Sequence, residues 1–487
     1  MCRVLAADIG ASSYRVVEGR YRDGVLSMKE LARFKHAPVL RGGHYYWDIC
    51  RMRDNLVRVI REAAGHGEQI RSIGFDTFGT DFGLLDKTGK LLDYPLAYRD
   101  SVSDGMYETY FKEEEELYKR IGGTYANTST AHILKGMKEQ GFPALKQAGR
   151  LLFMPDLLAY LFTGEMVNEY TIATSSRLLD IEKKQWDMEL IESLGLPGRI
   201  FHPLSDSGTT AGKLRKEISE GLPNLEAAVV TATACHDTAS AVTTIPHIEG
   251  CSFISSGSWS VKGIVCGSPY TSQEACTYKM SNEGQPGGRF RLIRNIAGLW
   301  ILEECVRQWN REGMDISIPK LCKRAEEGED FPSMIYTDAP DFAKPGDMPG
   351  KIKDYLRRTK QKVPETPEET MRAVINGLAM EYRRHNEQLE AVTGRPVTSL
   401  YVIGGGRRNR LLDQYAADAC GCPVICGHPE ATAAGNLLVQ LYALGEIASV
   451  EEFSYIAGRD VPEERYTPVP GRSNIWKERY KKYMELV

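Results

Sequence analysis

The chain has 487 residues, of which 42% are hydrophobic, and its formal net charge is −4 at pH 7. This length predicts two or three domains with sizeable cores, and the nearly balanced charge disfavours a nucleic-acid binder. The sequence contains no run of about 18 apolar residues, so we predict no membrane span. The N-terminus lacks the pattern of a secretory signal. We therefore expect a cytoplasmic protein with no nucleic-acid or membrane partner.

The 11 cysteines are scattered along the chain, which in a reducing compartment predicts mostly buried thiols. Cys420, Cys422 and Cys426 lie close together in the sequence. A metal site needs about four ligands, and no second Cys or His pair completes this group. The pattern instead indicates a helix that ends near Gly421, followed by a strand.

The first half reads as an α/β pattern with a mixed sheet. Residues 4–10 form an apolar strand, and residues 14–34 predict two more strands joined by a turn at Asp23 and Gly24. Apolar residues spaced three and four apart predict a helix over 48–64. A strand, a tight turn and a hairpin follow over 70–92, and residues 151–164 predict a helix closed by a glycine.

The pattern restarts near Ala227, so we expect two related halves that meet near Pro246. Residues 227–242 predict a strand, a polar turn and a small-residue helix. Residues 251–267 predict two strands joined by Ser-Ser-Gly-Ser, and 298–309 predict a helix. Residues 328–367 are polar and proline-rich, which favours a long surface excursion. A helix is predicted over 367–394. A strand and a glycine triplet follow near 398–406 and lead into another helix. A further helix is predicted over 430–445, and a charged surface helix closes the chain.

The first strand ends in residues suited to phosphate. Gly10, Ala11, Ser12 and Ser13 allow a phosphate to approach the backbone, where N–H groups and hydroxyls donate to its oxygens. Asp8 is placed to hold a Mg²⁺ ion, usually through water. The same segment is equally consistent with an ordinary hairpin.

His236, Asp237 and Thr238 follow a strand and precede a helix. Phosphoryl transfer to an alcohol needs a carboxylate that receives the hydroxyl proton, and Asp237 is suitably placed. The pattern alone equally allows Asp237 to serve only as the N-cap of the helix.

Two further turns resemble ligand-binding segments. The Ser-Ser-Gly-Ser turn at 255–258 mirrors the first segment, and Gly404, Gly405 and Gly406 leave a bare backbone on which a nucleoside can lie. Each is also consistent with a simple turn. The chain has neither a P-loop motif nor a dinucleotide fingerprint. Together the four segments predict a nucleotide cleft that closes by hinge motion.

The chain resembles the FGGY carbohydrate kinases, which share the actin-like ATPase fold. The resemblance covers residues 6–445 and rests on AADIGASSYRVVEGRY, HYYWDI, IGFDTFGTDFGLLD, YPLAYRDS, ACHDTASAV, FISSGSWSVKG, NIAGLW, YVIGGGRRNRLLDQYAADA and EATAAGN. It implies an α/β chain of two actin-like ATPase (ribonuclease H-like) domains flanking a central cleft. Residues 1–245 would bind the sugar and contain the first phosphate turn, and residues 246–487 would bind ATP.

The resemblance also implies the site residues. ATP contacts map to Ala11, Ser12, Ser13, Tyr14, Arg15, Ser258, Glu303 and Gly405. Sugar contacts map to Gly79, His236, Asp237, Thr238 and Asn295. The proton acceptor maps to Asp237, and Asp8 matches the acidic position near Mg²⁺. Tyr14 stands where the family usually has glycine, and Glu303 stands where related chains can have glutamine.

Asp76, Thr77 and Gly79, with Thr80 in place of a glutamine, resemble the branch of the family that phosphorylates L-rhamnulose. The implied activity is transfer of the terminal phosphoryl group of ATP to the 1-hydroxyl of that sugar, with Mg²⁺, by a monomer or homodimer. L-Fuculose, L-xylulose or glycerol are the alternative acceptors. An actin-like protein that clamps a protein partner is the alternative from another class.

Overall fold

The computed structural model describes residues 1–111, 114–257 and 259–487 and has a mixed α/β fold. The chain divides into two compact units: the first contains a complete six-stranded sheet, and the second contains most of a seven-stranded sheet. The first unit comprises Met1–Pro246, Cys266–Leu292 and Glu430–Asp460. The second comprises His247–Val265, Ile293–Pro429 and Val461–Val487.

A six-stranded sheet forms the centre of the first unit. Its order is β11 (Thr209–Lys213), β12 (Val229–Ala232), β6 (Ile70–Thr77), β1 (Cys2–Ile9), β2 (Ser13–Arg22) and β3 (Val25–Lys35). Strands β12, β6 and β1 run parallel, whereas β2, β3 and β11 pair antiparallel with their neighbours. The three parallel strands therefore all end at the same edge of the sheet.

Strand β1 is buried on both faces, which explains its unbroken apolar sequence. Because side chains alternate along a strand, Leu5 and Ala7 pack into one core and Val4 and Ala6 into another. Asp8 continues the second set, so its carboxylate faces the same side as Val4 and Ala6.

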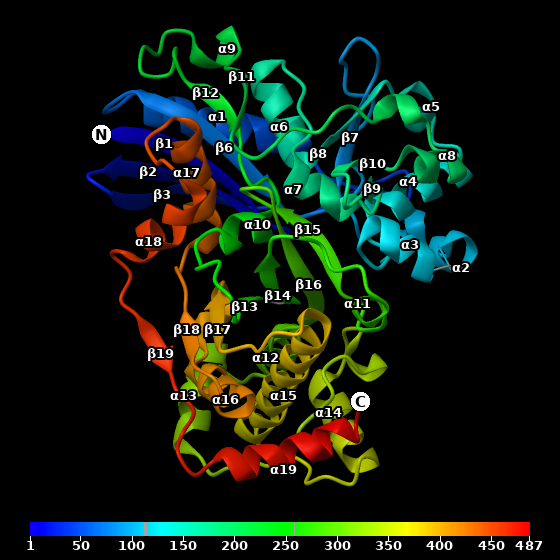
Figure 1. The fold of residues 1–487 in the computed structure, drawn as a ribbon, viewed down its shortest axis with the longest axis vertical. Coiled ribbons are helices and arrows are strands. Elements are labelled where there is room, and N and C mark those ends of the chain that lie inside the picture. Colours follow the sequence, from blue (N-terminus) through cyan, green and yellow to red (C-terminus); the bar gives the residue numbers. More distant parts are fainter. Residues whose placement is uncertain (112–113, 258) are drawn as a thin grey trace. The chain divides into compact units, whose positions relative to one another are not determined.

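Helices cover both faces of this sheet (Figure 1). On one face lie α1 (Ile49–Ala64) and α6 (Met154–Thr163), and on the other lie α10 (Asp237–Val242) and α17 (Ala431–Ala443). Helix α17, orange in Figure 1, comes from a distant part of the chain and contacts the blue strands β1 and β2.

Shorter elements complete the first unit. The helices are α2 (Met106–Tyr110), α3 (Glu114–Ile121), α4 (Thr130–Glu139), α5 (Pro143–Gln147), α7 (Tyr170–Ala173), α8 (Met188–Ser193), α9 (Lys216–Ser219), α11 (Gln273–Thr277) and α18 (Phe453–Gly458). The two-stranded sheets are β4 (Val39–Arg41) with β5 (His44–Tyr46), β7 (Phe82–Leu85) with β8 (Arg150–Phe153), and β9 (Leu179–Asp180) with β10 (Gln185–Trp186).

A second sheet has seven strands. Its order is β15 (Ser281–Gln285), β16 (Arg289–Ala297), β14 (Trp259–Cys266), β13 (Cys251–Ser256), β17 (Ser399–Ile403), β18 (Val424–Cys426) and β19 (Glu464–Tyr466). Strands β13, β17 and β18 are parallel, and β13 forms an antiparallel pair with β14. The predicted strand pair over 251–267 is confirmed.

The helices of the second unit are α12 (Trp300–Arg311), α13 (Ile318–Glu327), α14 (Met348–Arg358), α15 (Pro367–Thr393), α16 (Arg410–Cys420) and α19 (Ser473–Met484). Helix α15 begins after Thr366, whose side chain accepts from the Glu369 N–H, and ends at Gly394 with φ +69°. Proline at the first turn and a left-handed glycine at the end are the signals that predicted it. The predicted helix end at Gly421 and the strand after it are also confirmed.

Three sequence predictions are wrong. Residues 328–367 are not a surface excursion, because α14 lies within them and Phe331, Ile335 and Phe342 are buried in the core of the second unit. The C-terminal helix α19 is not purely a surface helix, since Trp476 and Tyr483 enter the same core. The helix predicted over 151–164 begins only at Met154, because the residues before it pair as strand β8 with β7.

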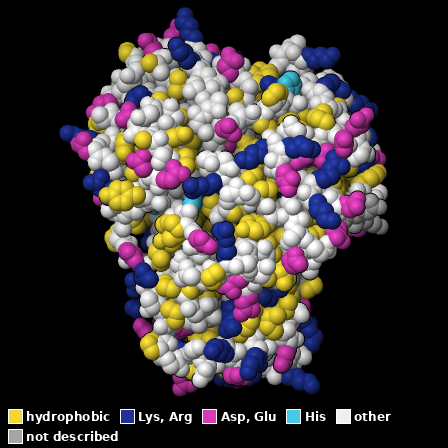
Figure 2. All heavy atoms as spheres, viewed as in Figure 1, with side chains coloured by type: hydrophobic (Ala, Val, Ile, Leu, Met, Phe, Trp, Pro, Cys, Tyr) yellow, Lys and Arg dark blue, Asp and Glu magenta, His cyan; other side chains and the backbone are white. Residues whose placement is uncertain are grey.

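Acidic and basic side chains are interspersed over the face that Figure 2 shows, in keeping with the small net charge. Within the described part of the chain, no helix combines the length and the apolar character needed to span a membrane.

Candidate active site

The ends of three parallel strands bring acidic residues together in the first unit. Asp8 on β1 and Asp76 on β6 are directly paired in the parallel register. The Thr77 N–H donates to Cys235 O at 2.9 Å, and Thr77 forms a parallel bridge with His236. The segment after β12 therefore lies beside the ends of β6 and β1, which is where ligands collect in α/β sheets.

Asp8 is held by Arg15 on the neighbouring strand β2. Arg15 donates to Asp8 Oδ2 through Nε at 2.9 Å and through a terminal nitrogen at 2.8 Å. Arg15 also bonds to Glu430, which precedes α17. Burial raises the pKa of the Asp8 carboxyl, Arg15 opposes that rise, and the negative charges of Asp237 and Glu430 add to it.

Asp76 is fully buried and accepts from Asn436 Nδ2 at 2.6 Å. Burial raises its pKa well above the ordinary value, the charges of Asp8 and Asp237 raise it further, and the Asn436 bond opposes the rise. Asp8 and Asp76 are register partners, and the charge of Asp237 raises the pKa of both.

Of these three residues, Asp8 and Asp76 are the ones that could hold a magnesium ion, because they are register partners at the strand ends. Asp76 Oδ1 is buried and has no hydrogen-bond partner among the described residues. Within that part of the chain, no group of three or more His, Cys, Asp or Glu side chains is arranged to hold a metal ion. Mg²⁺ usually takes only one or two protein carboxylates and keeps water or phosphate as its other ligands, so Asp8 and Asp76 are the residues that would hold one.

Asp237 stands at the start of α10, where the helix dipole favours a negative charge. The N-cap position belongs to His236, so the alternative prediction that Asp237 is the cap is wrong. Asp237 Oδ1 accepts from the N–H and the hydroxyl of Thr238. Its side chain is still 33% exposed, which leaves the carboxylate open to an outside proton donor.

The turn that carries Gly79 lies against His236. A Cβ built on Gly79 would come within 2.9 Å of His236 Nε2, so only glycine fits here. Thr80 has φ +76°, an unfavourable conformation for a β-branched residue. The Thr80 N–H donates to Ser175 Oγ at 3.0 Å, and the Thr80 carbonyl accepts from Thr130 Oγ1 at 2.6 Å.

The predicted phosphate turn has an exposed backbone and an inward-facing aromatic ring. Ala11 and Ser12 are exposed, and Ser13 begins β2. Tyr14 is buried, its ring stacks on Phe34 at 5.0 Å, and its hydroxyl accepts from Asn55 Nδ2 at 2.8 Å. The Tyr14 ring is thus part of the core.

The remaining predicted site residues belong to the second unit. Asn295 on β16 and Glu303 on α12 are exposed. Gly405 is exposed, and a Cβ built on it would contact nothing within 4 Å, whereas Gly404 has φ +83° and packs against Ser256 O. Ser258 lies outside the described residues.

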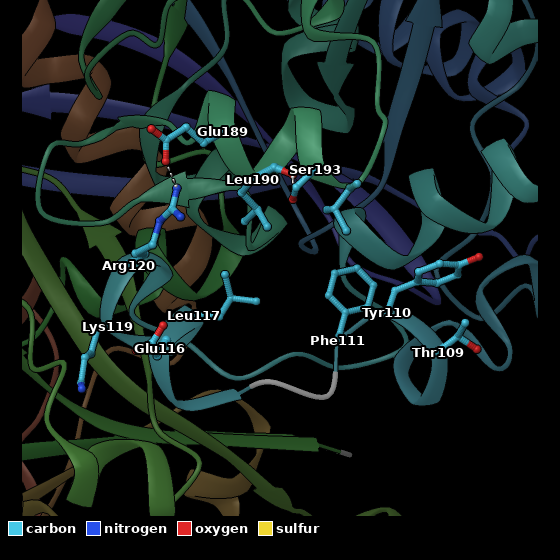
Figure 3. Close-up of a pocket in the computed structure, with 11 residues that line it drawn as sticks. Thr109, Tyr110, Phe111, Glu116, Leu117, Lys119, Arg120, Glu189, Leu190 and Ser193 are labelled. Atoms are coloured by element: carbon cyan, nitrogen blue, oxygen red, sulfur yellow. Dashed lines mark hydrogen bonds and ion pairs between the residues drawn. The ribbon is translucent and has the colours of Figure 1, made fainter.

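A pocket of about 810 Å³ lies elsewhere in the first unit, beside α2, α3 and α8 (Figure 3). Arg120 points toward Glu189 there and pairs with it at 3.1 Å, opposite the apolar side chains of Leu117, Phe111 and Leu190. None of the predicted site residues lines this pocket.

Some residues near the site were missed from the sequence. From the sequence, Asp76 indicates only the branch of the family, and Glu430 and Asn436 are only part of the EATAAGN motif. The residues behind His236 had no sequence signal: Arg177, Glu283 and Arg291. Burial of opposite charges is visible only once the fold brings them together.

Comparison with known proteins identifies the family. Residues 3–244 match the N-terminal domain of the FGGY family of carbohydrate kinases, and residues 252–444 match its C-terminal domain. The chain belongs to the FGGY family of carbohydrate kinases.

This FGGY kinase has relatives that match along almost their whole length. It is 38% identical over 466 residues to a rhamnulokinase of Bacteroides thetaiotaomicron, covering 95% of each chain. It is 37% identical over 450 residues to a rhamnulokinase of Oceanobacillus iheyensis, covering 92% of this chain and 94% of that one.

Solved structures support the fold. The FGGY kinase superposes on a ligand-bound xylulose kinase from Lactobacillus acidophilus with a TM-score of 0.81 at 14% identity, covering 100% of this chain and 98% of that one. It superposes on Plasmodium falciparum glycerol kinase with ADP with a TM-score of 0.78 at 15% identity, again covering 100% and 98%. The predicted α/β fold of the actin-like ATPase kinases is confirmed.

Proposed function

We propose that this FGGY kinase transfers the terminal phosphoryl group of ATP to the 1-hydroxyl of L-rhamnulose, giving L-rhamnulose 1-phosphate and ADP. The substrate assignment is supported by the rhamnulokinases that match the chain over nearly their full length at 37–38% identity. The observation that carries the chemistry is the partly exposed carboxylate of Asp237 beside His236 and the Asp8–Asp76 pair.

In this proposal Asp237 accepts the proton of the sugar 1-hydroxyl. The oxygen of that hydroxyl forms a bond to the γ-phosphorus, and the bond from the γ-phosphorus to the bridging oxygen of ADP breaks. Asp237 thereby acts as the general base.

The groups around Asp237 would position the reactants. The exposed backbone N–H groups of Ala11 and Ser12, with Ser13, would donate to phosphate oxygens. Gly79, His236 and Thr238 would line the sugar. When bound at Asp8 and Asp76, Mg²⁺ would offset the charge of the phosphates.

The residues of the second unit keep their predicted roles within this proposal. Asn295 would contact the sugar, and Ser258, Glu303 and Gly405 would contact ATP. The Tyr14 contribution would come from its backbone, and Arg15 would act chiefly through Asp8. The assignment of sugar binding to residues 1–245 and ATP binding to 246–487, the cytoplasmic location and a monomeric or homodimeric state also remain predictions.

An acceptor panel tests the proposal. ADP release would be measured with a coupled enzyme assay for L-rhamnulose, L-fuculose, L-xylulose and glycerol, and the product would be identified by ³¹P NMR. We expect the largest kcat/KM for L-rhamnulose, by about tenfold or more, which corresponds to about 1.4 kcal/mol of discrimination. A clear preference for another acceptor would reassign the substrate. Slow ATP hydrolysis that no sugar stimulates would instead point to an actin-like protein clamp.

A further inference from the structure

His236 is embedded in a buried cluster of charged residues within the first unit. Glu283 on β15 lies 3.6 Å from His236 Nδ1, and Arg291 on β16 lies 3.3 Å from the same nitrogen. Arg291 is fully buried and also donates to Glu283 Oε2 at 3.2 Å and to Gly284 O at 3.2 Å. Arg177 pairs with the other Glu283 oxygen at 3.1 Å.

The contact between Arg291 and His236 determines which ring nitrogen carries the proton. A guanidinium has five N–H donors and no acceptor, so a hydrogen bond between Arg291 and His236 Nδ1 requires an unprotonated Nδ1. Glu283 would favour the opposite arrangement, but its oxygen lies beyond hydrogen-bond distance from Nδ1 and already accepts from Arg291. In the neutral ring the proton therefore lies on Nε2.

We propose that Arg291 is a positioning residue that selects the Nε2–H tautomer of His236 and so makes this histidine a hydrogen-bond donor to the acceptor substrate. The Nε2 atom faces Gly79 and lies 3.8 Å from Asp237 Oδ1. A donor at this position can hold an oxygen of the sugar beside the carboxylate that receives the proton. This inference rests on the proposed function, because it assumes that the acceptor lies between His236 and Asp237.

The same cluster keeps the His236 ring neutral. Burial lowers its pKa, Glu283 and Asp237 act in the opposite direction, and Arg291 and Arg177 again lower it. These charged groups lie on four elements: Glu283 on β15, Asp237 on α10, Arg291 on β16 and Arg177 in the turn after α7. A neutral Nε2–H donor holds a sugar oxygen without adding a positive charge that would pair with Asp237 and weaken it as a base.

The tautomer is measurable directly in the wild-type protein. A long-range ¹H–¹⁵N correlation spectrum of histidine-labelled enzyme distinguishes protonated from unprotonated ring nitrogens, and His236→Gln identifies the His236 signals. We expect the Nε2–H form near neutral pH. An Nδ1–H ring in the folded wild-type enzyme overturns the proposal, and this measurement does not depend on activity.

Two variants separate Arg291 from its carboxylate partner. In Arg291→Met, Glu283 is free to accept from Nδ1–H, so the tautomer should reverse and the His236 pKa should rise. In Glu283→Gln, Arg291 still bonds to Nδ1, so the Nε2–H tautomer should persist. If Glu283→Gln reverses the tautomer while Arg291→Met leaves it unchanged, Glu283 is the selecting group and the inference is wrong.

Kinetics give a second readout. For Arg291→Met we expect kcat/KM for the sugar to fall about tenfold, the effect of one lost hydrogen bond, while KM for ATP stays within about twofold. An additional protonation step should appear on the acidic side of the pH profile. Arg289→Met is the matched control, since Arg289 lies on the same strand and pairs with Glu451 at the surface.

The outcomes distinguish the two proposals. A wild-type enzyme that phosphorylates no sugar contradicts the proposed function, whatever the tautomer. An active enzyme whose pH profile and sugar kcat/KM are unchanged in folded Arg291→Met contradicts the role of Arg291 alone. Melting curves of each variant verify that loss of activity is not loss of folding.

Discussion

The side-chain amide of Asn436 donates to Asp76 Oδ2 at 2.6 Å, joining α17 to the end of β6 across 360 positions of sequence. Both residues are fully buried. Asn436 Oδ1 in turn accepts from Gln440 Nε2 at 2.7 Å, and Gln440 also donates to Leu5 O at 2.9 Å. Helix α17 is thus held to the sheet by a chain of buried polar contacts that ends at the carboxylate of Asp76.

Removing this amide should destabilise the fold. Asn436→Ala leaves Asp76 without its donor and leaves Gln440 Nε2 without one of its acceptors. We therefore expect the free energy of unfolding to fall by about 2–3 kcal/mol. Urea denaturation measures the change. Asn55→Ala removes a half-buried amide that donates to Tyr14 in the same unit, and it should cost about 1 kcal/mol. Equal effects of the two variants would contradict the importance of the buried contact.

Helices α10 and α17 approach so closely that only glycine fits between them. A Cβ on Gly435 would lie 1.8 Å from Ser240 O. Gly435→Ala should therefore force the two helices apart and cost about 3 kcal/mol, measured by thermal or urea unfolding. Gly458→Ala is the matched control, because a Cβ there meets nothing within 4 Å. Its effect should stay within about 1 kcal/mol.

Asp237→Asn should separate chemistry from binding. The amide keeps the size of the carboxylate but cannot accept the proton of the sugar hydroxyl, so we expect kcat to fall about 10²–10⁴-fold. The affinity for ATP, measured by calorimetry, should change little. Near-normal turnover in a folded variant would remove Asp237 from the role of general base.

Asp8→Asn tests the proposed magnesium site. Replacing the carboxylate removes a negative charge, so half-maximal activity should need at least about tenfold more Mg²⁺ at fixed ATP. Glu30→Gln is a suitable control, because Glu30 also pairs with Arg15, at 3.5 Å, but its side chain is 40% exposed. If both variants show the wild-type Mg²⁺ dependence, Asp8 does not act near the ion.

Asp81 should make stability depend on pH. Burial raises the pKa of its carboxyl to about 8, against opposing hydrogen bonds from Trp47, Tyr98 and Thr80. Between the ordinary value near 4 and this raised value the folded state binds more protons than the unfolded state, so stability falls as pH rises. Asp81→Asn lacks this titration.

Urea midpoints of wild-type and Asp81→Asn proteins, measured from pH 4 to pH 9, test the effect. Relative to the wild type, the variant should gain stability as pH rises across that window. Asp86→Asn is the control at an exposed carboxylate whose pKa is lowered by its bonds to Thr88 and Lys90. Parallel wild-type and Asp81→Asn curves would show that Asp81 has an ordinary pKa.

Much of the local structure followed from sequence. Strands β1, β2 and β3, helix α1 and the long helix α15 were predicted because hydrophobic periodicity, a proline at the helix start and glycine at turns act over short distances. The strand–turn–helix position of Asp237 was predicted for the same reason. The prediction of a surface excursion over 328–367 failed because this proline-rich polar segment still contains apolar residues that enter a core. Their packing partners lie elsewhere in the chain.

By itself, the amino-acid sequence determined the strand-end motifs, the family and the chemical character of Asp8 and Asp237, since these depend on residue type and short spacing. Only the tertiary structure decided that 266–292 and 430–460 complete the first unit, that Asn436 contacts Asp76, and that Glu283 and Arg291 lie beside His236. Burial and charge pairing between remote segments depend on distances that the fold creates, and one-dimensional spacing does not encode those distances.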